Sequence, residues 1–416
     1  MWRTALVLAW LCAAIHARDT SLDAEVESYL EETGTPSSTM RATWANRIRL
    51  ESADGQFRVD VIGWLLWDND WVDSSEFATS DRSFFRSIRL GVQGHVSGNT
   101  VYKIQLEFAG GTVGVRDVFV GLRSLGSIGA SVIVGHFKEP FGLEFLNPLG
   151  ALFFMERSAP TRAFVPDRNV GVMLSSSEAY NLGPRTPGEG WFHNRVAWAI
   201  GLFQTTNRQA TENENGTGGL TTRISGLVID NAASNTVLHV AVGGTLRNDD
   251  SVRYAADRTL VDTGELAVDQ SARLAFEVMF IRGAFSLTAE AFGTSDDLDT
   301  DSRSHFWGGY VSIGTWVTGE RQAWNIDRVP PTTPQHNFRS GEGGAGGVWI
   351  GYRFDYLDLN DGSVRGGDQL SHTVGVIWAW NWNSRVMLNY QYFDVGSGPQ
   401  GAGTLHLLAV RIQFNF

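Results

Sequence analysis

The sequence has almost no cysteine: Cys12 is the single one among 416 residues. It lies in an apolar run, Ala5 to Ile15, that follows Arg3 and precedes the small residue Ala17. This arrangement is typical of a secretory signal peptide, which we expect to comprise residues 1–17. Removal of that peptide leaves a mature chain without cysteine, which excludes disulfide frameworks and thiolate metal sites.

Long hydrophobic runs are also missing. The amino-terminal run is shorter than the roughly 20 residues that a transmembrane helix needs, and no later stretch is apolar enough. The chain is instead rich in aromatic residues and glycine, with 15 Trp, 9 Tyr, 24 Phe and 47 Gly. Transmembrane β-barrels combine these features, because lipid-facing and lumen-facing residues alternate and each strand carries only a weak hydropathy signal.

Apolar and polar residues alternate with a period of two from Gln56 to the end of the chain. This period is that of strands with two different faces. The predicted strands are 56–67, 83–96, 99–109, 113–123, 129–137, 169–177, 191–205, 219–230, 236–247, 270–282, 284–293, 305–319, 346–359, 370–382, 385–394 and 405–416. An even number of strands is typical of bacterial single-chain barrels. The predicted fold is therefore all-β, a 16-stranded antiparallel transmembrane β-barrel.

The predicted connections alternate between short and long. Short turns mark the expected periplasmic end and lie at Gly98, Ser124–Ser127, Asn231–Ser234, Gly283 and Asn383. The other links are mostly longer and polar, as extracellular loops are. Residues 178–190 and 320–345 break this rule, because they are long where short turns are expected.

Residues 51–416 are assigned to the barrel and residues 18–50 to a periplasmic amino-terminal segment. Leu22, Val26, Tyr29 and Leu30 share one face of a helix, so a short helix is one interpretation of this segment. An unstructured exported tail is the other.

Charged residues of the strands are expected to face the lumen. Lys103, Glu107, Arg273 and Glu277 alternate with apolar neighbours, and a charged side chain on the lipid face at mid-bilayer costs about 2–4 kcal/mol. A polar interior in a barrel of this size predicts a water-filled channel, because side chains cannot fill it.

The last strand alternates apolar and polar residues and ends on Phe416. It resembles the closing strand of bacterial outer-membrane barrels, where a terminal aromatic residue belongs to the signal read by the barrel assembly machinery. We therefore expect that machinery to be a partner of Phe416.

Several blocks of sequence occur in the same order as in one known family. They are Trp44–Asp68, Arg86–Gly91, Gly135–Glu144, Phe154–Ser158, Pro166–Val172, Val261–Gly264, Thr318–Arg321 and Tyr356–Gly362. The run Phe137-Lys-Glu-Pro-Phe-Gly142 is the most specific of them. Through these blocks the chain resembles the phosphate-selective porins O and P.

This resemblance implies a trimeric outer-membrane barrel whose third loop, here residues 138–168, folds inward and narrows the pore. It also implies that cationic side chains guide anions through the pore. The candidate residues of this pathway are Arg86, Arg89, Lys138, Arg157, Arg162, Arg168, Arg273, Arg353, Arg385 and Arg411.

Lysine is scarce, since only Lys103 and Lys138 are lysines among the 33 basic residues. The lysine cluster known from the phosphate-selective members of the family cannot be built from two residues. Arginine also binds anions through charge-assisted hydrogen bonds, so an arginine-based phosphate pathway is one interpretation. A general porin is the other, because porin walls carry arginines opposite acidic loop residues without selecting phosphate.

We expect a passive porin in the bacterial outer membrane, with inorganic anions and small solutes as cargo. Its expected surroundings are membrane lipid and lipopolysaccharide, and its expected assembly is a homotrimer. No cofactor, metal, nucleic acid or catalytic step is expected. An outer-membrane barrel enzyme and an adhesive surface barrel are the alternatives from other functional classes.

Overall fold

The computed structural model describes residues 39–44, 46–125, 130–176, 195–206, 217–300, 302–325, 327–339 and 343–416. The expected signal peptide, residues 18–38 of the predicted amino-terminal segment 18–50, and the long link at 178–190 lie outside these ranges. So does half of the turn predicted at Ser124–Ser127.

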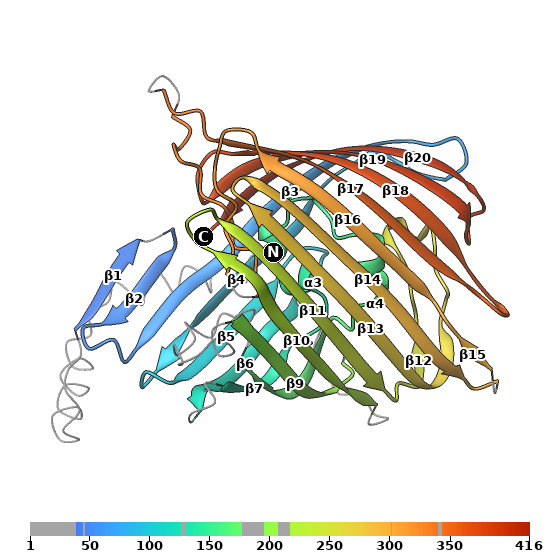
Figure 1. The fold of residues 1–416 in the computed structure, drawn as a ribbon, viewed down its shortest axis with the longest axis horizontal. Coiled ribbons are helices and arrows are strands. Elements are labelled where there is room, and N and C mark those ends of the chain that lie inside the picture. The colour runs from blue at the N-terminus through green and yellow to red at the C-terminus, as the bar shows by residue number, and fades with distance from the viewer. Residues whose placement is uncertain are drawn as a thin grey trace, which may run out of the picture.

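Sixteen antiparallel strands form the wall of a closed barrel (Figure 1), as the sequence predicted. They are β3 (Arg58–Asp73), β4 (Arg82–Val96), β5 (Thr100–Glu107), β6 (Gly114–Leu125), β7 (Ala130–Lys138), β8 (Arg168–Ser175), β9 (Val196–Gln204), β10 (Gly218–Asn231), β11 (Thr236–Arg247), β13 (Leu266–Arg282), β14 (Phe285–Leu298), β16 (Trp307–Trp316), β17 (Gly347–Asp361), β18 (Val364–Ala379), β19 (Ser384–Ser397) and β20 (Gly403–Asn415). Two short strands, β12 (Ser251–Val252) and β15 (Arg303–Ser304), pair with β13 and β14.

The barrel closes where β20 pairs with β3, with Asn415 opposite Trp64 and His406 opposite Asp73. Phe416 and Gly63 exchange two backbone hydrogen bonds of 2.9 and 3.0 Å beyond the last paired residues. A Cβ atom on Gly63 would lie 2.6 Å from the Phe416 ring. A larger residue at position 63 would therefore collide with the Phe416 ring, and glycine leaves the space that the ring occupies.

The two ends of the barrel differ in their links. The end that holds Phe416 and the short links 97–99, 232–235, 283–284 and 380–383 is called the turn end. The opposite end is called the loop end. The link between β16 and β17, residues 317–346, is long and belongs to the turn end, as the sequence predicted.

Predicted and observed strands agree closely, and β11 has the predicted bounds. The largest differences are at the loop end, where β3 continues to Asp73 and where Val364 already begins β18. These extensions were not predicted because Asp68, Asp70 and Arg365 are charged, and charged residues at the end of a strand are typical of loops. Asp68 and Asp70 are buried on the luminal face, so they continue the alternation.

A hairpin precedes the barrel. β1 (Met40–Trp44) and β2 (Ile48–Ser52) pair with each other, and β2 pairs with the first residues of β3. Figure 1 shows this hairpin projecting from the turn end. No strand is predicted from the sequence in residues 40–52, so this hairpin corrects the helix or tail expected for residues 18–50.

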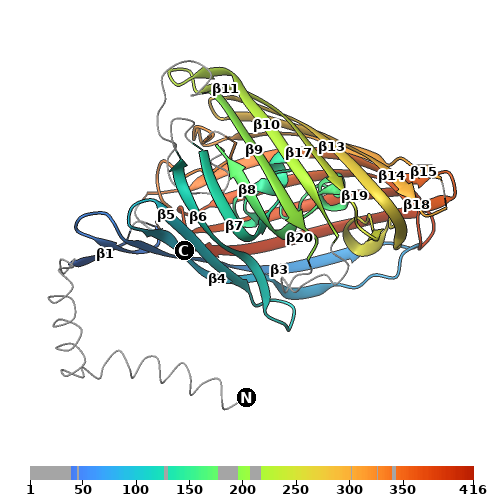
Figure 2. The same cartoon turned by 90° about the horizontal axis from the view of Figure 1, so that it is seen from below.

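Residues 139–167, called the inner segment, connect β7 to β8. They contain α3 (Leu143–Leu146), a 3-10 turn (Leu149–Ala151) and α4 (Ala159–Phe164). Figure 2 shows this segment within the ring of strands. A further 3-10 turn (Asp257–Thr259) lies between β12 and β13. Within the described residues, no helix has the length and apolar character needed to cross a membrane.

Part of the barrel interior is apolar, which differs from the uniformly polar lumen predicted from the sequence. Luminal side chains of β17–β20, such as Leu357, Met387 and Leu405, pack against the inner segment and against Tyr254 and Leu260. Phe153 of the inner segment stacks on Trp349 with ring centroids 4.9 Å apart. Burial of such side chains contributes about 1.5–3 kcal/mol each, so this packing holds the inner segment to one side of the lumen.

Candidate functional site

The inner segment takes its path from a few residues with special backbone roles. Gly142 has a φ of 78°, a left-handed conformation that glycine adopts readily, and α3 begins directly after it. Ser158 caps α4 by accepting a hydrogen bond from the Thr161 N–H, and Pro160 lies in the first turn. These residues turn the chain into the lumen and start its two short helices.

Glu290 on β14 anchors the start of the inner segment. Its carboxylate accepts hydrogen bonds from the N–H groups of Leu143 (2.6 Å) and Glu144 (2.9 Å) and from the Tyr310 hydroxyl (2.6 Å). Unpaired N–H groups at the start of a helix favour an acceptor with negative charge. These hydrogen bonds attach the inner segment to β14, a strand that is distant from β7 in the sequence.

Four of the predicted pathway arginines hold the inner segment through its backbone. Arg273 donates to the carbonyl of Phe164 (3.2 Å), Arg353 to that of Glu156 (2.9 Å), Arg385 to that of Leu152 (2.9 Å) and Arg411 to that of Met155 (2.5 Å). Their luminal orientation agrees with the predicted alternation. Their guanidinium groups, however, are engaged by the segment.

Glu156 is shared by three arginines from three parts of the chain. Its carboxylate accepts hydrogen bonds from Arg86 on β4 (2.6 and 2.8 Å), from Arg162 on α4 (3.0 Å) and from Arg411 on β20 (3.0 Å). Arg411 also binds Asp68 through two hydrogen bonds of 2.7 Å. The side chains of Arg86 and Arg162 remain 31% and 32% exposed, so this cluster has a cationic surface in the lumen.

The arginines also set the protonation of Glu156. Burial alone would favour its neutral form, but the positive charges of Arg86, Arg411 and Arg162 outweigh burial and hold its pKa well below the ordinary glutamate value. Glu156 is therefore ionised throughout the neutral and mildly acidic range.

A second shared carboxylate lies further toward the turn end. Asp117 on β6 accepts hydrogen bonds from Arg168 Nε (2.8 Å) and from Lys103 Nζ (2.7 Å). Arg168 also contacts Asp167 at 3.4 Å.

Lys138, the last residue of β7, and Arg157 of the inner segment bind backbone carbonyls. The Lys138 ammonium donates to the carbonyls of Phe145 (2.5 Å), Leu146 (3.0 Å) and Asn147 (3.0 Å). Arg157 donates to the Asn147 carbonyl (3.0 Å) and lies over the Phe145 ring. Within the described part of the chain, neither side chain has a carboxylate within ion-pair distance.

Arg89, the remaining predicted residue, belongs to the wall. It is buried, donates to Glu107 (2.7 Å) and stacks over the Trp64 ring at 4.6 Å. Of the ten predicted residues, the structure brings Arg86, Arg162 and Arg411 together at Glu156. It places Lys138 and Arg157 around the same carbonyl.

Two acidic residues of the inner segment face other walls of the barrel. Glu139 is fully buried and accepts hydrogen bonds from Arg247 (2.8 Å) and Asn169 (2.6 Å). Glu144 accepts from Arg353 (3.2 Å) and Ser158 (3.0 Å). The formal charges of residues 138–168 cancel in the sequence. In the structure, however, Glu139 and Glu144 are neutralised by arginines of the wall and not by Arg86 or Arg162.

The link between β16 and β17, residues 317–346, is called the turn-end link, and part of it enters the lumen. Asp327 is fully buried, pairs with Arg223 (3.1 Å) on β10 and accepts a hydrogen bond from the Ser225 hydroxyl. The Val329 N–H donates to the Asn147 side chain (2.9 Å). The link therefore touches both the wall and the inner segment.

Sequence reasoning missed several of these residues. Glu290, Asp327 and Arg247 act through partners more than 100 residues away, and only a fold provides such pairs. Lys103 could have been found, because its luminal position followed from the alternation. Within the described ranges, no group of three or more His, Cys, Asp or Glu side chains could hold a metal ion.

A family model described as phosphate-selective porin O and P matches residues 59–416. An uncharacterised protein of Caulobacter vibrioides is 28% identical over 402 residues, which cover 91% of this chain and 78% of that protein. The match extends over nearly all of the barrel.

Solved structures with a similar fold include porins. OmpT, an outer membrane protein of Vibrio cholerae solved in a trimer form, is 12% identical with a TM-score of 0.54 and covers 86% of this chain and 99% of its own. An anion-selective porin from Comamonas acidovorans is also 12% identical, with a TM-score of 0.51, and covers 86% of this chain and 99% of its own. At this identity the likeness concerns the fold.

Proposed function

Because this chain belongs to the phosphate-selective porin O and P family, and is thus an outer-membrane porin, we propose that it passes small hydrophilic solutes by passive diffusion and prefers anions. In this proposal the inner segment, which accepts hydrogen bonds from luminal arginines of the wall, narrows the pore. Solutes pass on the side of the lumen where Arg86 and Arg162 are exposed.

The observation that carries this proposal is the sharing of carboxylates. Three arginines, Arg86, Arg162 and Arg411, gather around two carboxylates, those of Glu156 and Asp68. The side chains of Arg86 and Arg162 are about one-third exposed, and a guanidinium that faces the lumen attracts a passing anion through its charge. Low-dielectric walls strengthen the resulting field.

The absence of a lysine cluster supports a second candidate, a general porin without phosphate preference. Arg273, Arg353 and Arg385 donate to backbone carbonyls, so they are not arranged around a common anion site. Tight phosphate binding needs several converging donors. Weak anion preference needs only the excess charge.

Bilayer recordings of the purified protein test both candidates. Under a potassium chloride gradient, we expect the reversal potential to lie toward the equilibrium potential of chloride, which is called the chloride side; the opposite direction is called the potassium side. Phosphate is then titrated into the same bath. Block at low phosphate concentration supports a phosphate site, weak selectivity without block supports the general porin, and a reversal potential on the potassium side overturns the proposed anion preference.

The assembly partners follow from the same proposal. A homotrimer is supported by the trimer form of the OmpT structure, which shares the fold. The barrel assembly machinery is proposed to read Phe416, the aromatic residue that follows β20. Lipid and lipopolysaccharide are proposed to surround the outer face, where large apolar side chains such as Leu274 and Phe276 are exposed.

A further inference from the structure

We propose that a cavity at the turn end binds small organic anions that carry an apolar ring or chain, such as aromatic carboxylates. This inference rests on the proposed anion preference and adds a class of substrate to it. Neither the family match nor the similar structures assign a ligand to this cavity.

The cavity has a volume of about 360 Å³. It lies between luminal side chains of β3–β7, the inner segment and residues 328–331 of the turn-end link. A water molecule takes up about 30 Å³ in the liquid, and pockets for small organic ligands begin at about 300 Å³. The space is therefore larger than an inorganic anion requires and suits a small organic molecule.

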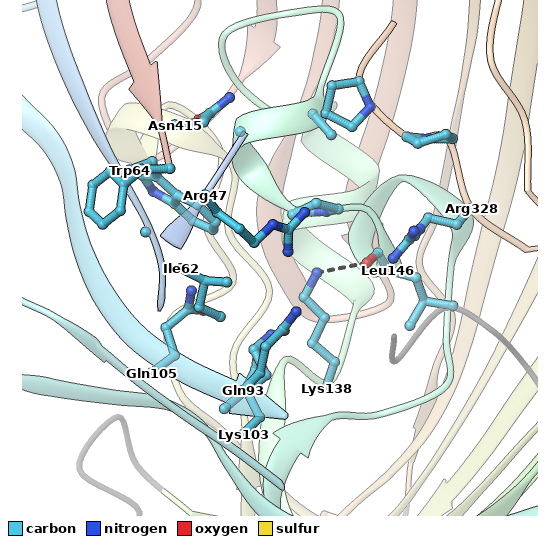
Figure 3. A pocket seen from close by; sticks show the side chains of 18 of the residues that line it. Arg47, Ile62, Trp64, Gln93, Lys103, Gln105, Lys138, Leu146, Arg328 and Asn415 are labelled. Atoms are coloured by element: carbon cyan, nitrogen blue, oxygen red, sulfur yellow. Dashed lines mark hydrogen bonds and ion pairs between the residues drawn. The ribbon is translucent and has the colours of Figure 1, made fainter. Parts of the chain in front are cut away.

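Basic side chains dominate the charged lining. Arg47, Lys103, Lys138 and Arg328 line the cavity, and Asp117 is the one acidic residue in its described lining. Figure 3 shows these four cations converging from different sides. Asp117 is itself shared between Lys103 and Arg168.

Lys138 shows how this charge is fixed in place. Its nitrogen lies within 3.0 Å of three carbonyl oxygens, and only the ammonium form has the three N–H donors that such a geometry needs. The side chain is more than nine-tenths buried. The same nitrogen lies 4.9 Å from the centre of the Phe145 ring, and a buried cation favours a nearby anion.

Arg47 provides the donor that faces the ligand. It lies between β1 and β2, is half-buried, and its guanidinium carbon is 5.5 Å from the centre of the Trp382 ring. Within the described residues it has no carboxylate within ion-pair distance and no hydrogen-bond partner for its guanidinium. Its fork of N–H groups matches a carboxylate in geometry.

The rest of the lining is apolar and aromatic, and includes Ile62, Trp64, Phe119, Phe137 and Leu146. An apolar ring or chain placed against these side chains leaves water, which is favourable in proportion to the area buried. Inorganic phosphate gains nothing from such a wall. The combination of cations and apolar rings thus favours an amphipathic anion over a fully hydrated one.

The test is block of single-channel current by benzoate, with acetate and inorganic phosphate as the comparison anions, using the full-length protein in a planar bilayer. Benzoate and acetate share the carboxylate and differ in the ring. We expect benzoate to block at a concentration at least about tenfold lower than acetate or phosphate, the factor expected for burial of an apolar ring.

Variants identify the site. We expect Arg47→Gln to raise the blocking concentration of benzoate by about tenfold, the effect of losing one charge-assisted hydrogen bond. The matched control is Arg41→Gln, which removes an exposed arginine from the same hairpin outside the cavity. We expect this control to leave the block unchanged.

Three outcomes separate this inference from the proposed function. Benzoate block that is selective and weakened only by Arg47→Gln supports the site. Equal block by benzoate and acetate in a chloride-selective wild-type channel overturns the inference and leaves the proposed function intact. A potassium-selective wild-type channel overturns the proposed function and, with it, the anion site; the wild-type comparison needs no variant to fold.

Discussion

The cluster around Glu156 is where single residues decide the charge of the pore. Arg86 and Arg162 bind this carboxylate and yet remain about one-third exposed. Arg157 lies nearby in the chain but donates to the Asn147 carbonyl instead. These residues therefore differ in how directly they meet a passing ion.

We predict that Arg162→Glu and Arg157→Glu each shift the reversal potential in a potassium chloride gradient toward the potassium side. Each substitution changes the local charge by two units in a lumen where opposing walls concentrate the field. Arg162 should show the larger shift because it is the more exposed. Unchanged reversal potentials in both variants contradict a role of the inner segment in selectivity.

The pKa of Glu156 gives a prediction for pH. Its pKa is lowered below the ordinary value of about 4.3, so its ionised form, and the stability that this form contributes, persist as the pH falls through the ordinary range and are lost only below it. The difference in reversal potential between wild type and Glu156→Gln is expected to be the same at pH 7 and at pH 3.5, where a glutamate with the ordinary pKa is mostly protonated. Convergence of the two proteins at pH 3.5 speaks against the lowered pKa.

At the scale of elements, the inner segment is held by anchors on several strands. Glu290 accepts three hydrogen bonds, two of them from α3. We predict that Glu290→Ala destabilises the segment, because the substitution leaves the buried N–H groups of Leu143 and Glu144 without an acceptor, which costs about 1–3 kcal/mol each. The measurement is the urea midpoint of barrel unfolding together with the noise of the open channel.

Ser286→Ala, on the same luminal face of β14, is the matched control for Glu290→Ala. It should leave both the midpoint and the noise close to wild type. An unaltered midpoint in Glu290→Ala would show that the apolar packing alone holds the inner segment.

The turn-end link depends on Asp327 in a similar way. We predict that Asp327→Asn lowers the urea midpoint by the equivalent of about 1.5–3 kcal/mol, since Ser225 and Arg223 lose a charged partner. Arg223 keeps Glu277 through two hydrogen bonds of 2.6 and 2.9 Å, which limits the loss. Asp297→Asn, in the exposed pair with Arg303, should leave the midpoint unchanged. Equal midpoints in the two variants contradict a structural role for the link.

Sequence reasoning reached the strands because alternation is a local signal. Alternation within one strand assigns residues such as Tyr102 and Lys103 to the lipid-facing or the luminal side, and it needs no information from the rest of the chain. The anchors of the inner segment could not be predicted in this way, because Leu143 and Glu290 meet only after the barrel closes. The length of the turn-end link was visible in the sequence, whereas its entry into the lumen was not.

At the scale of the whole molecule, the barrel divides its interior into two parts. One part is dry, where luminal apolar residues of β17–β20 pack against the inner segment. The other part carries the shared carboxylates Glu156 and Asp117 and the cations around them. The sequence predicted a polar lumen throughout, because the alternation alone does not reveal which luminal faces another segment covers.

The excess of positive charge in the wet part is the central claim of this account. The most direct test is the reversal potential of the wild-type channel and of the Arg86→Gln/Arg162→Gln double variant in the same potassium chloride gradient. We predict that the wild type reverses on the chloride side and that the double variant moves toward zero. Reversal of the wild type on the potassium side, or identical chloride selectivity in the two proteins, would contradict the claim.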